Sequence, residues 1–132
     1  MRGALLDTMA LLRMSFRPDL LSRAAGARIL EDEGPLFYSI VSLWEIGIKQ
    51  SRKGYHDLEL PGDWDQRLVE GFAEQGIGEI PILAKHCKMI ETLPAHHGDP
   101  FDRMLFAQAL DSGLEVVSSD WKVEEYGLVR IW

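Results

Sequence analysis

In the stretch ALLD at residues 4–7, three apolar residues are followed directly by a carboxylate. A continuous apolar run of this kind is typical of a strand that helices cover on both faces. The stretch LEVVSSD at residues 114–120 has the same order, with a predicted strand over 114–118 and then Asp120. We therefore expect two buried strands that each carry an aspartate at the carboxyl end, Asp7 on the first and Asp120 on the second.

Further strand patterns alternate with helical patterns between and beyond these two stretches. We predict strands over residues 36–40, 79–82 and 128–131. The predicted helices span about 18–33, 42–52, 63–75, 83–93 and 99–112, with a helical turn over 122–125. Strands that alternate with helices are typical of a parallel sheet with helices on both faces. We therefore predict an α/β fold with three layers and a mainly parallel central sheet.

The length and composition indicate one globular domain. The chain has 132 residues, which at about 150 residues per domain predicts a single domain over residues 1–132. Hydrophobic residues make up 46% and charged residues 27%, a balance that excludes a disordered or fibrous chain. The net charge of -7 argues against broad, charge-driven nucleic-acid binding. It does not exclude a nucleic-acid enzyme whose own acids hold a cation.

The single cysteine and the N-terminal residues indicate the cellular setting. Cys87 has no second cysteine to pair with, which is typical of a reducing compartment, so we expect a cytoplasmic protein. The apolar residues at the start are interrupted by Asp7 and Arg13, which does not fit a signal peptide. No stretch reaches the roughly 18 apolar residues of a membrane span, so we expect no membrane partner.

Four acids are predicted at the carboxyl edge of this sheet. Besides Asp7 and Asp120, they are Glu45, near the start of the helix after the second strand, and Asp102, near the start of the helix over 99–112. Carboxylates at close range repel one another, and a divalent cation removes that repulsion. Because the ligand atoms are all oxygen, we predict Mg2+ or Mn2+ rather than zinc. Such a cation activates water and neutralises phosphate charge, which suits phosphodiester hydrolysis.

Each of these acids also fits a purely structural role. Glu45 has the spacing of a capping box with the serine three residues before it. Asp99 before Pro100 is a natural N-cap, which makes Asp102 an acid that the helix dipole favours. Asp120 fits a turn after a strand. Only their convergence at one edge of the sheet favours a site.

Other polar residues leave alternatives open. His96 and His97 are adjacent on a predicted loop and fit no familiar zinc spacing, so we predict a loop or supporting role. Lys49 lies four residues after Glu45, which favours an ion pair between them. A phosphatase of the haloacid-dehalogenase type needs a second aspartate where Met9 stands. The candidate phosphate contacts are Lys49, Arg13, Arg52, Lys53 and Arg103.

The sequence resembles PIN-domain ribonucleases, and among them the VapC-like toxins of type II toxin-antitoxin systems. Four stretches carry the resemblance: LLDTMALL at residues 5–12, SIVSLWEIGIK at 39–49, HGDPFDRMLFAQA at 97–109 and VVSSD at 116–120. Tyr126 and the final Ile131-Trp132 extend it, so that it spans nearly the whole chain. The sequence departs from this branch at Met9, Arg13 and Ser118, where histidine, tryptophan and threonine are usual.

This resemblance implies a PIN-like α/β/α fold and a set of residue roles. The metal-binding and catalytic acids would be Asp7, Glu45, Asp102 and Asp120, supported by Ser118, Thr8 and Asp99. It also implies Mg2+ or Mn2+ as cofactor and RNA as substrate. The implied partners are a cognate VapB-like antitoxin, which wraps the toxin and blocks its site, and a second toxin chain in a homodimer.

The sequence therefore predicts a metal-dependent endoribonuclease that is the toxin of a type II toxin-antitoxin pair. We expect Asp7 and Asp102 to bind the principal cation directly. Glu45 and Asp120 would complete the acidic cluster, through water or at a second cation. The alternative is a catalytically inert PIN-like binding module, which need not bind Mn2+.

Overall fold

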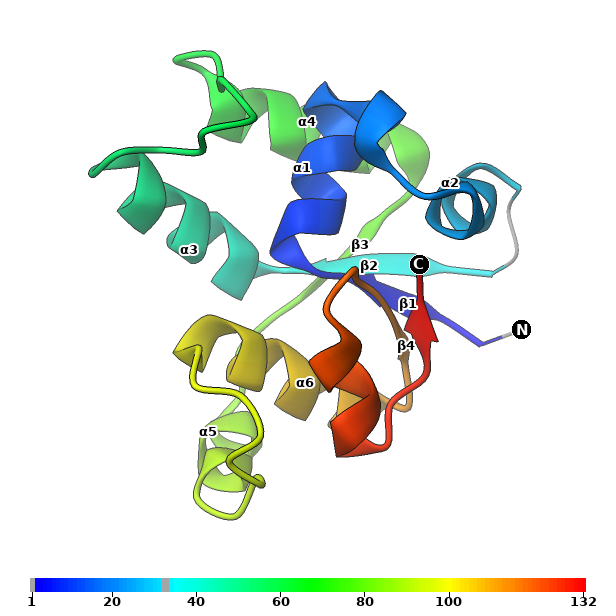
Figure 1. Cartoon of the computed structure of the whole chain (residues 1–132), viewed down its shortest axis with the longest axis vertical. Coiled ribbons are helices and arrows are strands. Elements are labelled where there is room, and N and C mark those ends of the chain that lie inside the picture. The colour runs from blue at the N-terminus through cyan, green and yellow to red at the C-terminus, as the bar shows by residue number, and fades with distance from the viewer. Residues whose placement is uncertain (1, 32–33) are drawn as a thin grey trace.

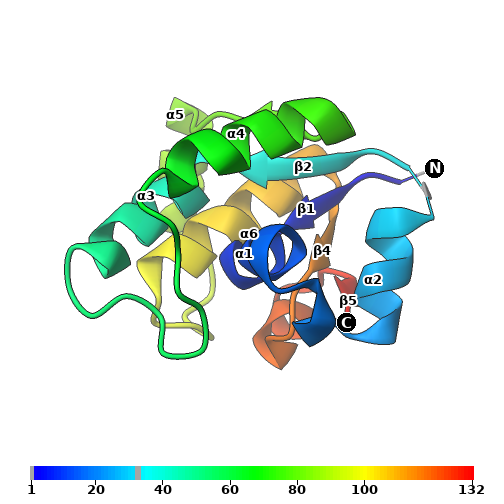
Figure 2. The same ribbon diagram turned by 90° about the horizontal axis from the view of Figure 1, so that it is seen from above.

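The computed structural model describes residues 2–31 and 34–132. Its five strands form one sheet, in which every neighbouring pair is parallel (Figures 1 and 2). Across the sheet the order is β3 (Gly78–Ile80), β2 (Leu36–Ser39), β1 (Ala4–Leu6), β4 (Glu115–Val117) and β5 (Arg130–Ile131). The first strand of the chain is therefore the central strand of the sheet.

Helices lie on both faces of this sheet (Figure 1). They are α1 (Thr8–Phe16), α2 (Arg23–Leu30), α3 (Ile40–Gln50), α4 (Trp64–Gln75), α5 (Ala84–Ile90) and α6 (Pro100–Ser112), with the short 3-10 helices η1 (Pro18–Leu20) and η2 (Trp121–Tyr126). Helices α1, α2 and α4 cover one face, and α5 and α6 cover the other. The predicted three-layer α/β/α fold is confirmed. Within the described residues, no helix combines the length and the apolar character that crossing a bilayer requires.

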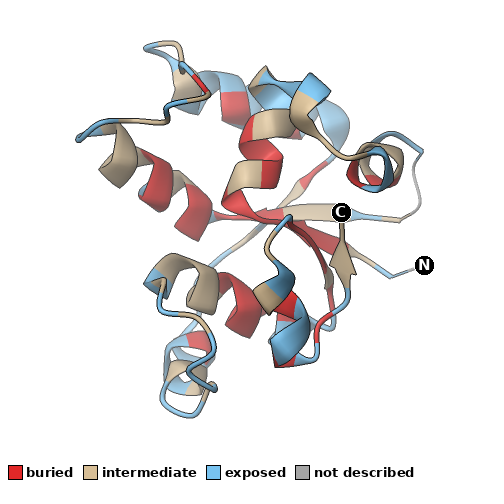
Figure 3. Ribbon diagram, viewed as in Figure 1, coloured by how far each residue is buried: buried red, intermediate tan, exposed pale blue. Residues whose placement is uncertain are grey.

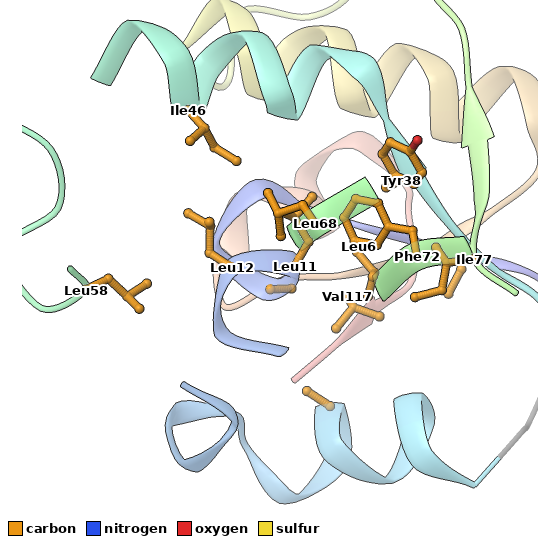
Figure 4. Packing of buried hydrophobic residues seen from close by; sticks show 13 residues of the cluster. Leu6, Leu11, Leu12, Tyr38, Ile46, Leu58, Leu68, Phe72, Ile77 and Val117 are labelled. Carbon is orange, nitrogen blue, oxygen red and sulfur yellow. The ribbon is translucent and has the colours of Figure 1, made fainter. Parts of the chain in front are cut away.

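The side chains of β1 alternate between two hydrophobic cores. Leu6 packs with Leu11 of α1 and Phe72 of α4 in the cluster of Figure 4. Leu5 faces the other way and joins a second cluster with Leu105 of α6. All three residues of β1 are fully buried, as Figure 3 shows for this part of the sheet. Because both faces of the strand are covered, it appears in the sequence as an unbroken apolar run.

Two helices near the N-terminus differ from the prediction. The sequence pattern does not reveal α1, because residues 10–12 are completely buried and the helix lacks a clear division into polar and apolar faces. The helix predicted over 18–33 is η1 followed by α2. Ser22 separates them, since its Oγ accepts the N–H of Ala25 at 3.1 Å and caps α2.

The start of α3 also differs from the prediction. Its N-cap is Ser39, whose Oγ accepts the N–H of Val41 at 3.1 Å. The helix therefore begins at Ile40, and the capping box between Ser42 and Glu45 is wrong because both residues lie inside the helix. The side chain of Glu45 is thereby available for contacts outside its own helix.

The remaining differences are at element ends. Asp32 and Glu33, within the first predicted helix, lie outside the described residues. Strand β3 ends before Pro81, which has no N–H to continue the ladder. Helix α5 ends at Ile90, three residues earlier than predicted.

The reversal of strand order between β1 and β4 positions the candidate site. After β1, the chain builds one half of the sheet with β2 and β3, and then returns to place β4 on the other side of β1. Leu6 pairs in register with Val117, and the backbone N–H of Asp7 donates to the carbonyl oxygen of Val117 at 3.1 Å. In open parallel sheets, ligand sites lie at the carboxyl ends of the strands at such a reversal.

Candidate active site

Asp7 follows the central strand β1 and stands directly before helix α1. It is the N-cap of α1, and its Oδ1 accepts the N–H of Ala10 at 2.8 Å. The residue is 8% exposed, so its carboxylate is held almost out of solvent. The carboxyl end of β1 therefore presents a fixed, buried acid, as the sequence predicts.

Thr8 connects α1 to α3 through Glu45. The Thr8 hydroxyl lies 2.8 Å from Glu45 Oε1 and 2.9 Å from Ser42 Oγ. Lys49 Nζ lies 2.8 Å from Glu45 Oε2, which is the ion pair predicted from their spacing. Both oxygens of the buried Glu45 carboxylate thus have partners, one a hydroxyl and one a cation.

Asp99 and Asp102 stand at the start of α6. Asp99 is the predicted N-cap, and its Oδ1 accepts the N–H groups of Phe101 at 2.8 Å and Asp102 at 3.3 Å. The side chain of Asp102 is 24% exposed. Asp99 is thus occupied with capping, whereas the Asp102 carboxylate lies beside His97, with its Oδ2 3.2 Å from His97 Nε2.

Asp120 follows β4 and caps η2. Its Oδ1 accepts the N–H of Lys122 at 3.0 Å, and its own N–H donates to Ser118 Oγ at 3.0 Å. The buried Ser118 therefore orients the turn that carries Asp120, which fits the supporting position that the resemblance implies.

His97 enters the site more closely than the sequence predicts. Its Nε2 lies 2.7 Å from Asp120 Oδ2 and 3.2 Å from Asp102 Oδ2. Within the described ranges, these three side chains are the group whose potential metal-ligating atoms all lie within 4.8 Å of one another. His96 instead turns toward Glu125, with its Nδ1 3.8 Å from Glu125 Oε2.

Sequence alone could not distinguish the two adjacent histidines. Tertiary contacts place His97 rather than His96 beside the acids, because the N–H of His97 donates to the Tyr126 hydroxyl at 2.9 Å and fixes the loop. The one sequence feature that favours His97 is that the stretch resembling PIN-domain ribonucleases begins at His97 and not at His96.

Burial and mutual repulsion disfavour ionisation of two of the acids. Burial is the main cause that raises the pKa of Asp7 to about 6, and the charges of Glu45 and Asp120 act in the same direction. Hydrogen bonds from Ser118 and Ala10 oppose this rise in the pKa of Asp7.

Asp102 is affected more strongly than Asp7. Burial, followed by the charges of Asp99, Asp7, Glu45 and Asp120, raises its pKa to about 8. The carboxylates that the sequence places on four different segments are therefore close enough to interact. They form a negative cluster, buried at Asp7 and Glu45 and partly exposed at Asp102 and Asp120, that a proton or a cation stabilises.

The donor set of this cluster fits a hard divalent cation. The side chains of Asp7, Glu45, Asp102 and Asp120 offer carboxylate oxygens, which are the ligands that Mg2+ and Mn2+ prefer. Lys49 neutralises only Glu45 by direct contact. Burial is the main cause that raises the pKa of Asp7 and of Asp102, and the charges of neighbouring acids add to it, so a bound cation would favour their ionised forms.

Two of the candidate phosphate contacts are used inside the protein. The Arg103 guanidinium donates to the backbone carbonyls of Pro94 at 2.9 Å and Leu93 at 3.2 Å. Arg13 packs over the ring of Trp132, with its Cζ 5.4 Å from the centroid. Arg52 and Lys53 line an open pocket beside the loop that follows α3.

Comparison with known proteins shows the family. A model of the PIN domain matches residues 4–128. A search of curated proteins finds no match. One similar solved structure is VapBC2 from Rickettsia felis bound to a promoter DNA fragment, with 13% sequence identity, coverage of 97% of this chain and 96% of that chain, and a TM-score of 0.67. Another is DNA-bound VapBC from Salmonella typhimurium, with 18% identity, coverage of 98% of this chain and 97% of that chain, and a TM-score of 0.63. A third is FitAcB from Neisseria gonorrhoeae, with 14% identity, coverage of 96% of this chain and 95% of that chain, and a TM-score of 0.60.

These likenesses agree with the fold described above. At such low identity, the three structures share a fold with this chain, and they do so over nearly their whole length. The family model covers both aspartates at the strand reversal, Asp7 and Asp120. The chain therefore belongs to the PIN domain family.

Proposed function

We propose that this protein is a metal-dependent endoribonuclease and the toxin of a type II toxin-antitoxin pair. The observation that carries the proposal is the acidic cluster at the strand reversal, in which Asp7 and Asp102 have raised pKa values. PIN domains are generally nucleases, which supports hydrolysis of a phosphodiester bond.

The acids of the cluster would hold the cation, and their neighbours would orient them. Asp7 and Asp102 would bind Mg2+ or Mn2+ directly, and Glu45 and Asp120 would complete the cluster. A bound divalent cation supplies positive charge that favours ionisation of the attacking water and stabilises charge on the phosphate. The supporting residues are Thr8, which holds Glu45, Ser118, which orients Asp120, and Asp99, which caps α6.

One pocket of the described residues is lined by cations that would suit an RNA substrate, beside Asp57 and Glu59. Arg52 and Lys53 line the pocket beside the loop after α3, together with Arg17. These cations could contact phosphates away from the scissile bond. The protein as a whole carries a net charge of -7, so RNA binding would depend on the cation and on the shape of the RNA.

The proposed partners are a VapB-like antitoxin and a second copy of the chain. Two of the similar structures are VapBC assemblies bound to DNA, which supports an antitoxin partner for this chain. The proposed location is the cytoplasm, and its support is the lone Cys87, which excludes an internal disulfide.

The test is cleavage of a panel of transfer, ribosomal and messenger RNAs by the purified protein. Each RNA is incubated with Mn2+, with Mg2+ and with a chelator, beside Asp7→Asn and the control Asp65→Asn. Asparagine can still cap α1, so Asp7→Asn should fold. Asp65 is an exposed acid on α4, away from the cluster.

We expect discrete products that disappear with the chelator and with Asp7→Asn, and that persist with Asp65→Asn. Cleavage by Asp7→Asn would contradict the residue assignment, and cleavage in chelator would contradict the metal dependence. A protein that neither cleaves RNA nor binds Mn2+ would instead be an inert binding module.

A further inference from the structure

Both ring nitrogens of His97 have defined hydrogen-bond partners. Nδ1 lies 3.0 Å from the backbone nitrogen of Asp99, whose N–H points to it. A backbone N–H can only donate, so Nδ1 must accept and cannot itself carry a proton. In the neutral ring, the single proton therefore belongs on Nε2.

The Nε2–H of His97 is directed at the Asp120 carboxylate, and Asp102 lies nearby. Nε2 lies 2.7 Å from Asp120 Oδ2, a short and therefore strong charge-assisted hydrogen bond, and 3.2 Å from Asp102 Oδ2. The ring is 12% exposed and packs edge-on against Phe106. Its orientation is thus fixed by packing as well as by hydrogen bonds.

A nitrogen that binds a metal must present a lone pair. His97 could present one from Nε2 only if its proton moved to Nδ1, where the N–H of Asp99 already points. Asp99 is the N-cap of α6, and its Oδ1 is bound to the first turn of that helix. A shift of the proton would therefore place two donors against each other at the residue that caps the helix carrying Asp102.

We infer that His97 is a positioning residue that orients Asp120 by donating from Nε2, and that it is not a ligand of the cation. This inference rests on the proposed function, because it concerns the cation that the acidic cluster would hold. His97, Asp102 and Asp120 lie close enough together to form a three-ligand metal site, so the proximity alone suggests the opposite role.

The donor role of His97 affects both the orientation of Asp120 and the choice of cation. Asp120 is held at both oxygens, since Lys122 N–H donates to Oδ1 and His97 donates to Oδ2, so its orientation is set before a cation binds. The ligands left for the cation are carboxylate oxygens, which favour Mg2+ or Mn2+ over ions that prefer nitrogen.

The first test measures the tautomer directly in the metal-free protein. Long-range 1H–15N correlation spectra of histidine-labelled protein distinguish a protonated Nε2 from a protonated Nδ1. We expect His97 to carry its proton on Nε2 with Nδ1 unprotonated. A proton on Nδ1 would overturn the inference. This measurement needs neither metal nor RNA, so its outcome is independent of the proposed function.

The second test measures the ligands of bound Mn2+ by pulsed electron paramagnetic resonance. We expect no coupling from a directly bound histidine nitrogen. Such a coupling that disappears in His97→Asn would make His97 a ligand and overturn the inference. A wild-type protein that binds no Mn2+ at all would contradict the proposed function instead, and the tautomer measurement would still decide the role of His97.

Two substitutions of His97 test the roles of its two ring nitrogens separately. In His97→Gln the side-chain amide can replace the Nε2 donor, whereas in His97→Asn the side-chain oxygen can replace only the Nδ1 acceptor. We expect His97→Asn to weaken Mn2+ binding about 10-fold, as loss of a hydrogen bond to a ligand does, and His97→Gln to stay within about 3-fold of wild type. His96→Asn is the control and should not change the affinity. Equal losses in both His97 variants would contradict a donor role.

Discussion

The hydroxyl of Thr8 lies 2.8 Å from Glu45 Oε1 and joins the first turn of α1 to the middle of α3. A hydroxyl has one proton, and an ionised carboxylate can only accept, so Thr8 donates to Glu45 and accepts from the nearby Ser42 hydroxyl. The three residues are buried, and no water is needed to satisfy this chain of hydrogen bonds. Residues far apart in the sequence therefore hold one acid of the cluster in place.

Replacement of Thr8 by valine should destabilise the protein. The substitution keeps the shape of the side chain but leaves a buried carboxylate without its donor. We expect the free energy of unfolding at pH 7 to fall by about 1–3 kcal/mol, measured by urea denaturation. Thr8→Ser keeps the hydroxyl and should lose about 1 kcal/mol at most. A valine variant as stable as the serine variant would show that the hydrogen bond contributes little.

The metal-free protein should lose stability as the pH rises. The pKa values of Asp7 and Asp102 are about 6 and about 8 in the folded protein, against 3.8 for an ordinary aspartate. Between about pH 4 and pH 8, the folded state therefore binds more protons than the unfolded state, and the free energy of unfolding falls with rising pH. Urea denaturation at pH 5 and pH 8 in chelator measures this difference.

Asp102→Asn is the matched control for the pH dependence. It removes the group with the higher pKa, so the decrease in stability between pH 5 and pH 8 should become smaller. Mn2+ added to the wild-type protein at pH 8 should restore stability, because the ion binds only the folded state. Wild-type protein that is more stable at pH 8 than at pH 5 in chelator would contradict the assigned environment of these two acids.

Replacement of Lys49 by methionine should have opposite effects on stability and on metal affinity. Lys49 is the cation paired with Glu45, and it also interacts electrostatically with Asp99 and Asp102. Without it, the metal-free protein should lose about 1 kcal/mol of stability, because the buried Glu45 keeps its charge without its partner. Mn2+ should bind about 5-fold more tightly, since a competing positive charge is gone.

Calorimetric titration with Mn2+ measures the affinity of the Lys49 variant. Lys88→Met is the control, because Lys88 pairs with Glu91 on the exposed surface of α5, away from the acidic cluster. The control should leave the affinity unchanged. Weaker Mn2+ binding by Lys49→Met would mean that the lysine supports the site in some way other than as a counter-ion to Glu45.

Arg103→Lys should loosen the loop before α6. The guanidinium bridges the carbonyls of Pro94 and Leu93, a geometry that a single ammonium group cannot reproduce. We expect a loss of about 1–2 kcal/mol in unfolding free energy and faster amide exchange over residues 94–98, measured by mass spectrometry. Arg67→Lys, in an exposed ion pair, should change neither. Unchanged exchange with weaker RNA binding would instead make Arg103 a phosphate contact.

The alternation of strands and helices was enough to predict the layers of this fold. The apolar runs at 4–6 and 115–117 are strands of the parallel sheet, because strands covered on both faces need no polar side chains. Reading the hydrophobic pattern fails for α1, which is buried by the sheet, by α3 and by the loop that follows α3. A helix buried on most sides loses the periodicity by which helices are recognised.

Asp7, Asp102 and Asp120 could be predicted because each stands at the end of a strand or in the first turn of a helix, whereas Glu45 lies in the middle of α3. Their partners were not predictable, because they depend on contacts between distant segments. Thr8 meets Glu45 across two helices, and His97 meets Asp120 across two loops. The Arg103 guanidinium, which sequence alone leaves as a candidate phosphate contact, is bound to backbone carbonyls by the loop that wraps it.

The pairing of β1 with β4 joins two segments that are far apart in the sequence, residues 4–6 and 115–117. During synthesis, Asp7 is made well before the strand that must lie beside it, and Asp120 follows that strand. A nascent chain therefore carries most of the acids without the sheet that brings them together. The four acids can therefore come together only after translation has passed β4 and Asp120.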